Sequence, residues 1–450
     1  MPTMTMPARP MSNEVPQAHP GIPRLLGWLL MLPFVFFAGH GTFSFQAGTA
    51  LGGSLSNLVA TRDTGVVNYV IIPGVVYSIV VWMIVVNLGR VVTLAFQSSA
   101  LTLLALLTIG SALWSQDPVR SSYNGLFYLI DTLFAYYLVD RFEPDEIMTL
   151  LSRAGVLVAL LGLFVVLFFP QFGLTTGIRT ADAWKGIFID RTSAAKCLVF
   201  LLSPALVFGY RRLSYSRVAY ILLLLVSIVM AQAVTALIVL FFYLIFMIAL
   251  SLARRLERKS VLFFSALVPV GACLIFALAL PFAADILNLL GRDITFSGRT
   301  TVWNAVLTSV MKRPMLGYGF YSFWLGLKGE SANIIVTSHW AFGYAHNGML
   351  EILLQLGVVG LVLFLVTLMQ AIRNAWICVR YNPSAGLDWF IGLIVLTILY
   401  NIDEATVVFP NELLSILYVV ACCGLAQTVR RYKREAQVPK SYRRAEQITP

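Results

Sequence analysis

The chain has 450 residues, of which 59% are hydrophobic and only 12% are charged. A soluble fold of this size would lack enough polar surface to cover itself, so the composition excludes an ordinary soluble enzyme and indicates a protein embedded in a bilayer. A formal charge of +11 would suggest a nucleic-acid partner in a soluble protein. Here we expect no nucleic acid and interpret the charge as a topological signal.

The order of polar and apolar segments predicts an all-α, polytopic integral membrane protein. Residues 1–23 are rich in proline and polar side chains, which predicts a disordered cytoplasmic tail. A membrane domain is expected over residues 24–428, followed by a basic cytoplasmic tail over residues 429–450. The apolar run from Leu25 to about Phe45 is interpreted as a spanning helix, not as a cleaved secretion signal, because further spans follow it.

Long apolar runs predict about 12 transmembrane helices in total. The boundary inside Tyr220–Leu252 is placed at Gln232, on the basis of that polar residue and of length. After the first span, the helices are expected near residues 67–88, 92–113, 123–140, 148–169, 195–210, 217–231, 232–252, 261–282, 347–371, 387–402 and 411–428.

The distribution of positive charge predicts the orientation of these helices. With the amino terminus placed in the cytoplasm, 21 of the 32 Lys and Arg residues fall on the inner side. This bias has the sign that the positive-inside rule requires. It places a smaller loop (170–194) and a large loop (283–346) in the periplasm. We therefore expect a multi-pass protein of the bacterial inner membrane with both termini cytoplasmic.

The large loop is expected to carry an amphipathic helix from about Gly298 to Lys312. Ser297 lies in a stretch of good N-cap candidates, and apolar residues then recur at helical spacing. We expect this helix to lie flat on the outer membrane surface. Arg299 falls in its first turn, where free N–H groups and the helix dipole favour an anion and a guanidinium matches phosphate. The alternative is an interfacial arginine bonded to lipid headgroups or a carbonyl.

The large loop returns to the membrane at His346, which is expected at the outer mouth of a spanning helix. A histidine that titrates near neutral pH is a natural proton acceptor for a sugar hydroxyl, and an adjacent carboxylate could fix its tautomer. Glu351 is expected about one turn deeper. A structural role for His346 is the alternative, with His339 as a nearby competitor. The segment Arg313–Phe320 is interpreted as a turn that sets geometry.

Charges elsewhere allow further hypotheses. Arg179, Lys185 and Arg191 in the smaller loop, taken with Arg299, could form a cationic basin suited to a lipid pyrophosphate, although the simplest view treats them as ordinary loop charges. Asp131 lies inside a predicted span and is expected to find a tyrosine or backbone partner.

The remaining acidic pair and the cysteines are assigned no chemistry. Asp403 and Glu404 could line an acceptor site or mark the membrane interface, and the interface is favoured. The five cysteines lack metal-like spacing, so no disulfide framework and no metal site are expected.

Several stretches, in this order, resemble the O-antigen ligase and Wzy-type polymerase superfamily, and look closest to exopolysaccharide polymerases of the succinoglycan type. The weaker stretch Leu113–Pro118 also looks like that family. The main stretches are Ser297–Thr300 with Trp303, Arg313–Gly319, and Ala345–Glu351 followed by Leu356–Gly360.

The resemblance implies an all-helical membrane glycosyltransferase that uses an undecaprenyl-pyrophosphate-linked glycan as donor, with no metal and no other cofactor. It implies that Arg299 binds the pyrophosphate and that His346 activates the acceptor hydroxyl, supported by Ser297, Asn347 and Glu351. Many relatives carry a His-Lys-Asn-like element in the smaller loop. This chain has Gly186–Thr192 there, and Arg191 would supply the second cation.

Three functions remain open from the sequence. The preferred one is a polymerase that joins lipid-linked repeat units into a surface polysaccharide or exopolysaccharide, acting with a glycan acceptor, membrane lipids and other assembly or chain-length proteins. The second is an O-antigen ligase that transfers lipid-linked polysaccharide to lipid A-core. The third is a transporter of polysaccharide precursors.

Overall fold

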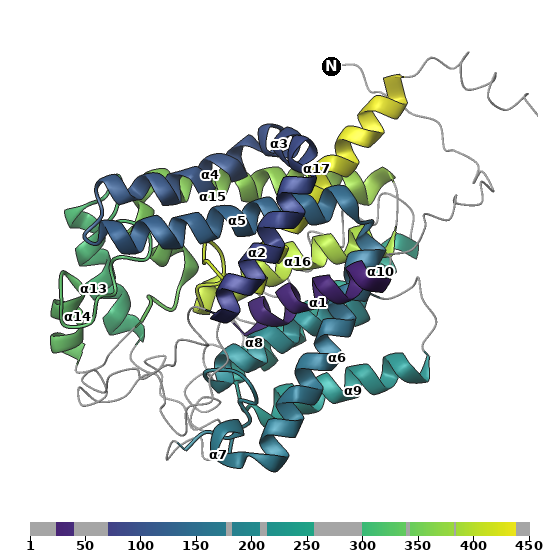
Figure 1. Ribbon diagram of the computed structural model, residues 1–450, viewed down its shortest axis with the longest axis horizontal. Helices are drawn as coiled ribbons and strands as arrows, with labels where there is room; N and C mark the ends of the chain where they lie inside the picture. Colours follow the sequence, from purple (N-terminus) through teal and green to yellow (C-terminus); the bar gives the residue numbers. More distant parts are fainter. Residues whose placement is uncertain are drawn as a thin grey trace, which may run out of the picture.

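The computed structural model describes residues 24–39, 71–176, 182–207, 214–255, 299–338, 343–381 and 384–437. Within these ranges the chain is helical, and strand-type pairing is limited to two isolated bridges, Leu174–Trp184 and Leu325–Lys328. The all-α fold class is therefore confirmed. The helices (Figure 1) are α1 Arg24–Ala38, α2 Ile72–Val86, α3 Leu88–Gln97, α4 Ser99–Gly110, η3 Ser111–Leu113, α5 Pro118–Arg141, α6 Pro144–Phe168, α7 Pro170–Gly173, α8 Arg191–Leu202, η4 Ser203–Leu206, α9 Tyr215–Met230, α10 Val234–Arg255, α13 Arg299–Lys312, α14 Ser331–Ser338, α15 Gly348–Tyr381, α16 Ala385–Asp403 and α17 Leu413–Gln437.

Five of the described helices are long and apolar enough to cross a membrane, namely α6, α10, α15, α16 and α17. The pair α2 and α3 would make a sixth span, but the two helices meet at an angle of 86°. The expectation of about 12 spans is not confirmed by the part of the chain that the structure describes. The helix predicted at residues 261–282 falls outside it.

Two predicted boundaries have opposite outcomes. The helix expected over residues 92–113 is divided, since α3 ends at Gln97 and Ser98 has φ −112° and ψ 45° before α4 begins. The boundary placed at Gln232 is confirmed, because α9 ends at Met230 and α10 starts at Val234. Gln232 itself has a positive φ of 52°, which a continuous helix cannot contain.

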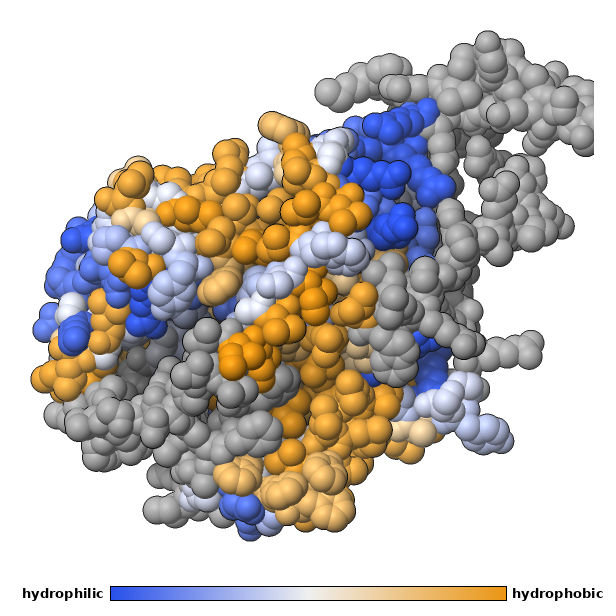
Figure 2. Space-filling model, viewed as in Figure 1, coloured by the Kyte–Doolittle hydropathy of each residue, from blue (hydrophilic) through white to orange (hydrophobic). Residues whose placement is uncertain are grey.

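Helices α4, α5, α15 and α17 run side by side along one part of the molecule, and α16 packs against α10 and α17 (Figure 1). Many apolar side chains point away from this bundle, among them Phe96, Leu103 and Leu167. Figure 2 shows that apolar residues cover the middle of one face, whereas hydrophilic residues gather around α13–α14 and at the end of α17. An apolar band between two polar ends is the surface of a multi-pass membrane protein.

The amphipathic helix expected over residues 298–312 is present as α13, but its apolar face lies against protein. Val302, Val306 and Val310 are buried in a small core with Tyr318 and Leu354. Helix α13 docks on α14 and α15, because those helices offer an apolar surface that removes these side chains from water. Its position flat on the membrane surface stays a prediction.

Candidate functional site

His346 lies two residues before the start of α15, and its backbone is in the left-handed region at φ 50°. Its Nδ1 lies 3.6 Å from Oε1 of Glu404, the residue that follows α16. Glu404 is 1% exposed, and its other oxygen accepts a 2.7 Å hydrogen bond from the hydroxyl of Tyr344. The rings of Tyr344 and His346 are 4.1 Å apart between centroids. A partly exposed imidazole is therefore held against a buried carboxylate and a phenol.

Glu351 holds the backbone that carries His346. This carboxylate is 2% exposed, and it accepts a 2.7 Å bond from the backbone N–H of Ala345. It also accepts bonds from Trp324 Nε1 at 3.1 Å and from Gln355 Nε2 at 2.5 Å. Glu351 thus supports the loop, whereas the carboxylate that the structure places beside the imidazole is Glu404.

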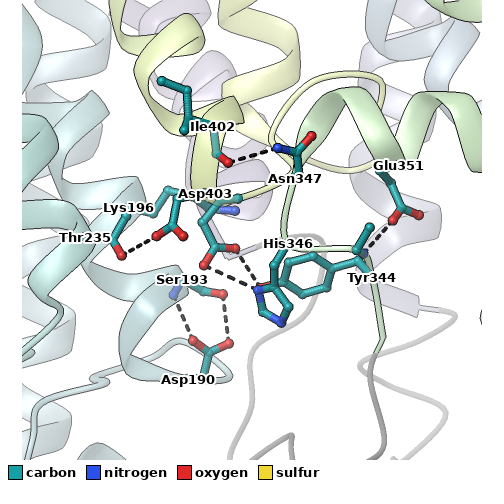
Figure 3. Close-up of polar contacts among 12 residues, drawn as sticks. Asp190, Ser193, Lys196, Thr235, Tyr344, His346, Asn347, Glu351, Ile402 and Asp403 are labelled. Carbon is teal, nitrogen blue, oxygen red and sulfur yellow. Dashed lines mark hydrogen bonds and ion pairs between the residues drawn. The ribbon is translucent and has the colours of Figure 1, made fainter. Parts of the chain in front are cut away.

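Asn347 joins the start of α15 to the end of α16. Its Oδ1 accepts from the backbone N–H groups of Met349 at 3.1 Å and Leu350 at 3.0 Å, which caps the first turn of α15. Its Nδ2 donates to the carbonyl of Ile402 at 3.0 Å (Figure 3). This double contact fixes the distance between the helix that follows His346 and the helix that precedes Glu404.

A second set of ionic groups lies at the same end of the bundle (Figure 3). Lys196 of α8 pairs with Glu412, the residue before α17, at 2.9 Å between Nζ and Oε1. Asp403 accepts a 2.6 Å bond from the hydroxyl of Thr235 in α10. The middle of α8, the first turn of α10, the end of α16 and the residue before α17 therefore contribute polar groups to the same end of the molecule as the start of α15.

The smaller predicted loop contributes the start of α8. Asp190 caps this helix by accepting from the backbone N–H of Ser193 at 2.8 Å. The guanidinium of the next residue, Arg191, donates to the carbonyl of Gln232 in the α9–α10 turn. Lys185 is buried in this loop, and burial lowers the pKa of its ammonium while Asp190 partly opposes that shift. Arg191 thus lies at the edge of the polar end, whereas Arg179 lies outside the described residues.

The predicted phosphate-binding helix adjoins His346 through Trp303. Its indole Nε1 donates to the carbonyl of Ala345 at 3.0 Å, so α13 is bonded to the residue directly before His346. Arg299 is the first residue of α13, one turn before Trp303, and its side chain lies outside the described part of the structure. Ser297 and His339 also lie outside it.

The Arg313–Gly319 segment fills a break in α15. Gly357 interrupts this helix with φ 63° and ψ −164°, and a Cβ atom there would overlap the backbone of Met315. The freed N–H of Val358 donates to the carbonyl of Pro314 at 2.8 Å. The segment predicted to be a turn therefore supplies a hydrogen-bond acceptor for the backbone of a broken spanning helix. Inside a bilayer the N–H and C=O groups of such a helix need partners from the protein.

The same segment docks on the weaker family-like stretch after α4. Trp114 Nε1 donates to the carbonyl of Leu316 at 2.8 Å, and the backbone N–H of Gln116 donates to the carbonyl of Tyr318 at 3.1 Å. Gly319, at φ 97°, leaves no room for a Cβ atom beside Ser115. Three stretches that were singled out from the sequence are thus packed together next to the loop that carries His346, namely Leu113–Pro118, Arg313–Gly319 and Leu356–Gly360.

The predictions for the acidic residues Asp131 and Glu404 have different outcomes. Asp131 has the predicted partners, because it accepts 2.8 Å bonds from the hydroxyl of Tyr77 and from the backbone N–H of Asn411. The preference for an interfacial Glu404 is wrong, because the side chain is buried against His346 and Tyr344. Within the described ranges, no group of three or more His, Cys, Asp or Glu side chains is arranged to hold a metal ion.

Sequence reasoning did not find Lys196, Tyr344 or Glu412. A signal was present for two of them. Lys196 is a single lysine among the apolar residues 194–202 of α8, and Glu412 is an isolated carboxylate directly before the apolar start of α17. Charges in such places are expensive and mark a partner or a site.

Comparison with known proteins supports the family-like motifs. The O-antigen ligase family model matches residues 219–365. "Exopolysaccharide production protein ExoQ" of Rhizobium meliloti is 28% identical over 126 residues, which are 26% of this chain and 28% of that protein. "Putative polysaccharide ligase RP358" of Rickettsia prowazekii is 32% identical over 109 residues, 23% of this chain and 27% of that protein. The matched region spans little more than a quarter of each relative, and the resemblance to this superfamily is confirmed.

Proposed function

Because residues 219–365 match the O-antigen ligase family, we propose that this multi-pass membrane protein is a glycosyltransferase that polymerises undecaprenyl-pyrophosphate-linked repeat units into a surface polysaccharide or exopolysaccharide. The observation that carries the proposal is the contact of His346 with the buried carboxylate of Glu404 at one end of the helical bundle. An imidazole held by a carboxylate is suited to accept a proton from a hydroxyl group. Its place at the end of the bundle would let it meet a lipid-linked donor and a glycan acceptor.

The proposed reaction is a single displacement at the anomeric carbon of the donor. Glu404 faces Nδ1 of His346 and would hold the proton there, so that Nε2 is the basic nitrogen. The acceptor hydroxyl passes its proton to Nε2 as its oxygen attacks the anomeric carbon. The bond from that carbon to the pyrophosphate oxygen breaks, and the lipid pyrophosphate leaves with the bonding electrons. Glu404 would stabilise the resulting imidazolium.

Cationic side chains would balance the leaving pyrophosphate. We assign this role to Arg299, which begins a helix bonded through Trp303 to the His346 loop, and to Arg191 at the start of α8. A guanidinium group can donate two hydrogen bonds to a phosphate, and the dipole at a helix N-terminus also favours the negative charge of that phosphate. Charge balance by arginine would let the reaction proceed without a metal ion or another cofactor. Activity that survives a chelator in detergent or nanodiscs would agree, and loss that a divalent metal restores would refute this part.

The proposed setting is the bacterial inner membrane with both termini cytoplasmic. The large and small loops, and with them His346, would then face the periplasm, where the acceptor and other assembly or chain-length proteins are found. Alternation of the helices agrees with this arrangement. The starts of α8, α10 and α15 and the end of α16 lie together, whereas Arg254, at the far end of α10, pairs with Asp388 at the far end of α16.

A ligase that transfers a finished glycan to lipid A-core is the second candidate. It is favoured by the description of the family and by the name of the Rickettsia relative. The same residues would serve both reactions, because only the acceptor differs.

The test is deletion of the gene, complementation with wild type or variants, and separation of surface glycans by size. Loss of long polymer on deletion supports the polymerase, loss of all O-chain from lipid A-core supports the ligase, and accumulation of precursor in the inner leaflet supports a transporter. His346→Ala and Arg299→Ala should each fail to complement while accumulating normally. His339→Ala is the matched control. Wild-type glycans from His346→Ala would overturn the mechanism.

A further inference from the structure

Lys196 is a buried cation that the proposed chemistry does not use. It lies in the middle of α8, its side chain is 8% exposed, and it pairs with Glu412 at 2.9 Å. A lysine is costly to place in such a position unless carboxylates surround it. Glu412 is itself 2% exposed. Burial raises the pKa of Glu412, and Lys196 opposes that rise.

Lys196 also interacts electrostatically with Glu404, the carboxylate that faces His346. Glu404 and Glu412 in turn repel each other. Two buried carboxylates that repel each other cannot both ionise easily, and one of them would take up a proton unless a cation stabilises their negative charge. Lys196 supplies that cation from a different helix.

We propose that Lys196 is a positioning residue that keeps Glu404 ionised and directed at His346. The inference rests on the proposed function, because it assigns Lys196 a role through the Glu404–His346 pair. Removal of the lysine would leave Glu404 harder to ionise. A neutral Glu404 would hold the imidazole less firmly and would not stabilise the imidazolium that forms during transfer.

The charged and titratable groups that face this cluster come from several helices. Glu404 follows α16, Glu412 precedes α17, and His346 precedes α15. Asp190, the cap of α8, also attracts Lys196. Asp403 is bonded to Thr235. Lys196 therefore faces three carboxylates, and its removal makes the surroundings of His346 more negative, whichever of them carries the charge.

The experiment compares Lys196→Met with Glu412→Gln by the pH dependence of glycan transfer in nanodiscs. Loss of a cation makes Glu404 hold a proton more tightly, so Lys196→Met should move the acid limb up by about one pH unit. Transfer near that limb would then fall about tenfold. Glu412→Gln removes a negative charge instead and should leave the acid limb in place or move it down. Lys196→Arg, which keeps the charge, should restore most of the activity.

A purely structural Lys196–Glu412 pair predicts the same defect in both single variants, because each breaks the same contact. The inference would be overturned if the acid limb of the pH profile moved in the same direction in both single variants, or did not move in Lys196→Met. If Lys196→Met does not accumulate, the double variant Lys196→Met/Glu412→Gln removes both charges and avoids an unpaired buried ion. Its acid limb should lie above that of Glu412→Gln alone, and coincidence of the two would overturn the proposal. Activity in His346→Ala would instead refute the proposed function itself.

Discussion

The imidazole of His346, which precedes α15, contacts the carboxylate of Glu404, which follows α16, because the start of α15 and the end of α16 lie at the same end of this helix pair. The 3.6 Å separation of Nδ1 and Oε1 is longer than an ideal hydrogen bond. Catalytic contacts are often loose without substrate and tighten when it binds. The contact makes the charge of Glu404 a direct target for testing.

Glu404→Gln should lower the rate of glycan transfer by about 10²-fold or more, because it removes the charge that stabilises the imidazolium. The amide keeps an oxygen for the hydroxyl of Tyr344, so the folded protein should accumulate normally. The rate is measured in purified nanodiscs. Glu330→Gln, which affects only the exposed pair with Lys312, is the control and should be silent. A Glu404→Gln rate within twofold of wild type would remove the carboxylate from the mechanism.

Glu351→Ala should impair transfer through the backbone of the His346 loop. The substitution leaves the N–H of Ala345 and the indole of Trp324 without their buried acceptor, at a cost of about 1–3 kcal/mol for each unsatisfied group. Both the thermal midpoint of unfolding and kcat should therefore fall. Trp324→Phe removes one donor and keeps Glu351, so its effect should be smaller. An Ala variant with normal stability and normal kcat would contradict this role.

Gly357→Ala should destabilise the protein by about 1–3 kcal/mol or more, because the residue has a positive φ and its Cβ would overlap the backbone of Met315. The expected readout is a lower thermal midpoint in detergent and less protein in the membrane. Gly89→Ala is the matched control, since a Cβ there meets nothing within 4 Å and lies inside a helix. Equal midpoints for the two variants would show that the α15 break tolerates a side chain.

Asp131→Leu should lower stability more than Tyr77→Phe. The first change leaves both the hydroxyl of Tyr77 and the N–H of Asn411 without Asp131, whereas the second removes one bond. Hydrogen bonds between spanning helices each contribute about 0.6 kcal/mol, up to roughly 1.7 kcal/mol. Resistance to detergent-induced unfolding measures the difference. The reverse order of stability would show that Asp131 is not held by these partners.

The sequence predicted the parts of this fold that depend on local pattern. The Gln232 break, the helix that begins at Arg299 and the turn role of Arg313–Gly319 follow from residue type and periodicity, and the structure contains them. The division of the 92–113 run at Ser98 was missed, although the polar triplet Gln97, Ser98 and Ser99 interrupts the apolar residues there, because hydrophobic periodicity does not distinguish a polar turn of a continuous helix from a break.

The site was predictable only in part, for a physical reason. His346 and Asn347 are adjacent in sequence and were found, but Glu404 and Lys196 reach His346 only through the packing of α8 and α16. The spacing of carboxylates along the chain favoured Glu351, one turn from His346. In the structure Glu351 instead accepts a hydrogen bond from the backbone N–H of Ala345. The left-handed conformation of His346 turns its ring toward the end of α16 and Glu404.

Two exposed positions that are expected on opposite sides of the membrane should reveal the orientation of the membrane domain. Leu327→Cys and Tyr215→Cys, at 51% and 97% exposure, lie in segments expected outside and inside respectively. In intact cells a membrane-impermeant maleimide should label Cys at 327 only, and in permeabilised cells it should label both. Cys197, Cys378, Cys422 and Cys423 are buried and should stay unlabelled, while Cys273 is replaced by Ser beforehand. The positive-inside bias predicts this orientation, because moving Lys and Arg across the bilayer is costly. Labelling of the 215 position alone would place His346 in the cytoplasm and exclude a periplasmic glycosyltransferase.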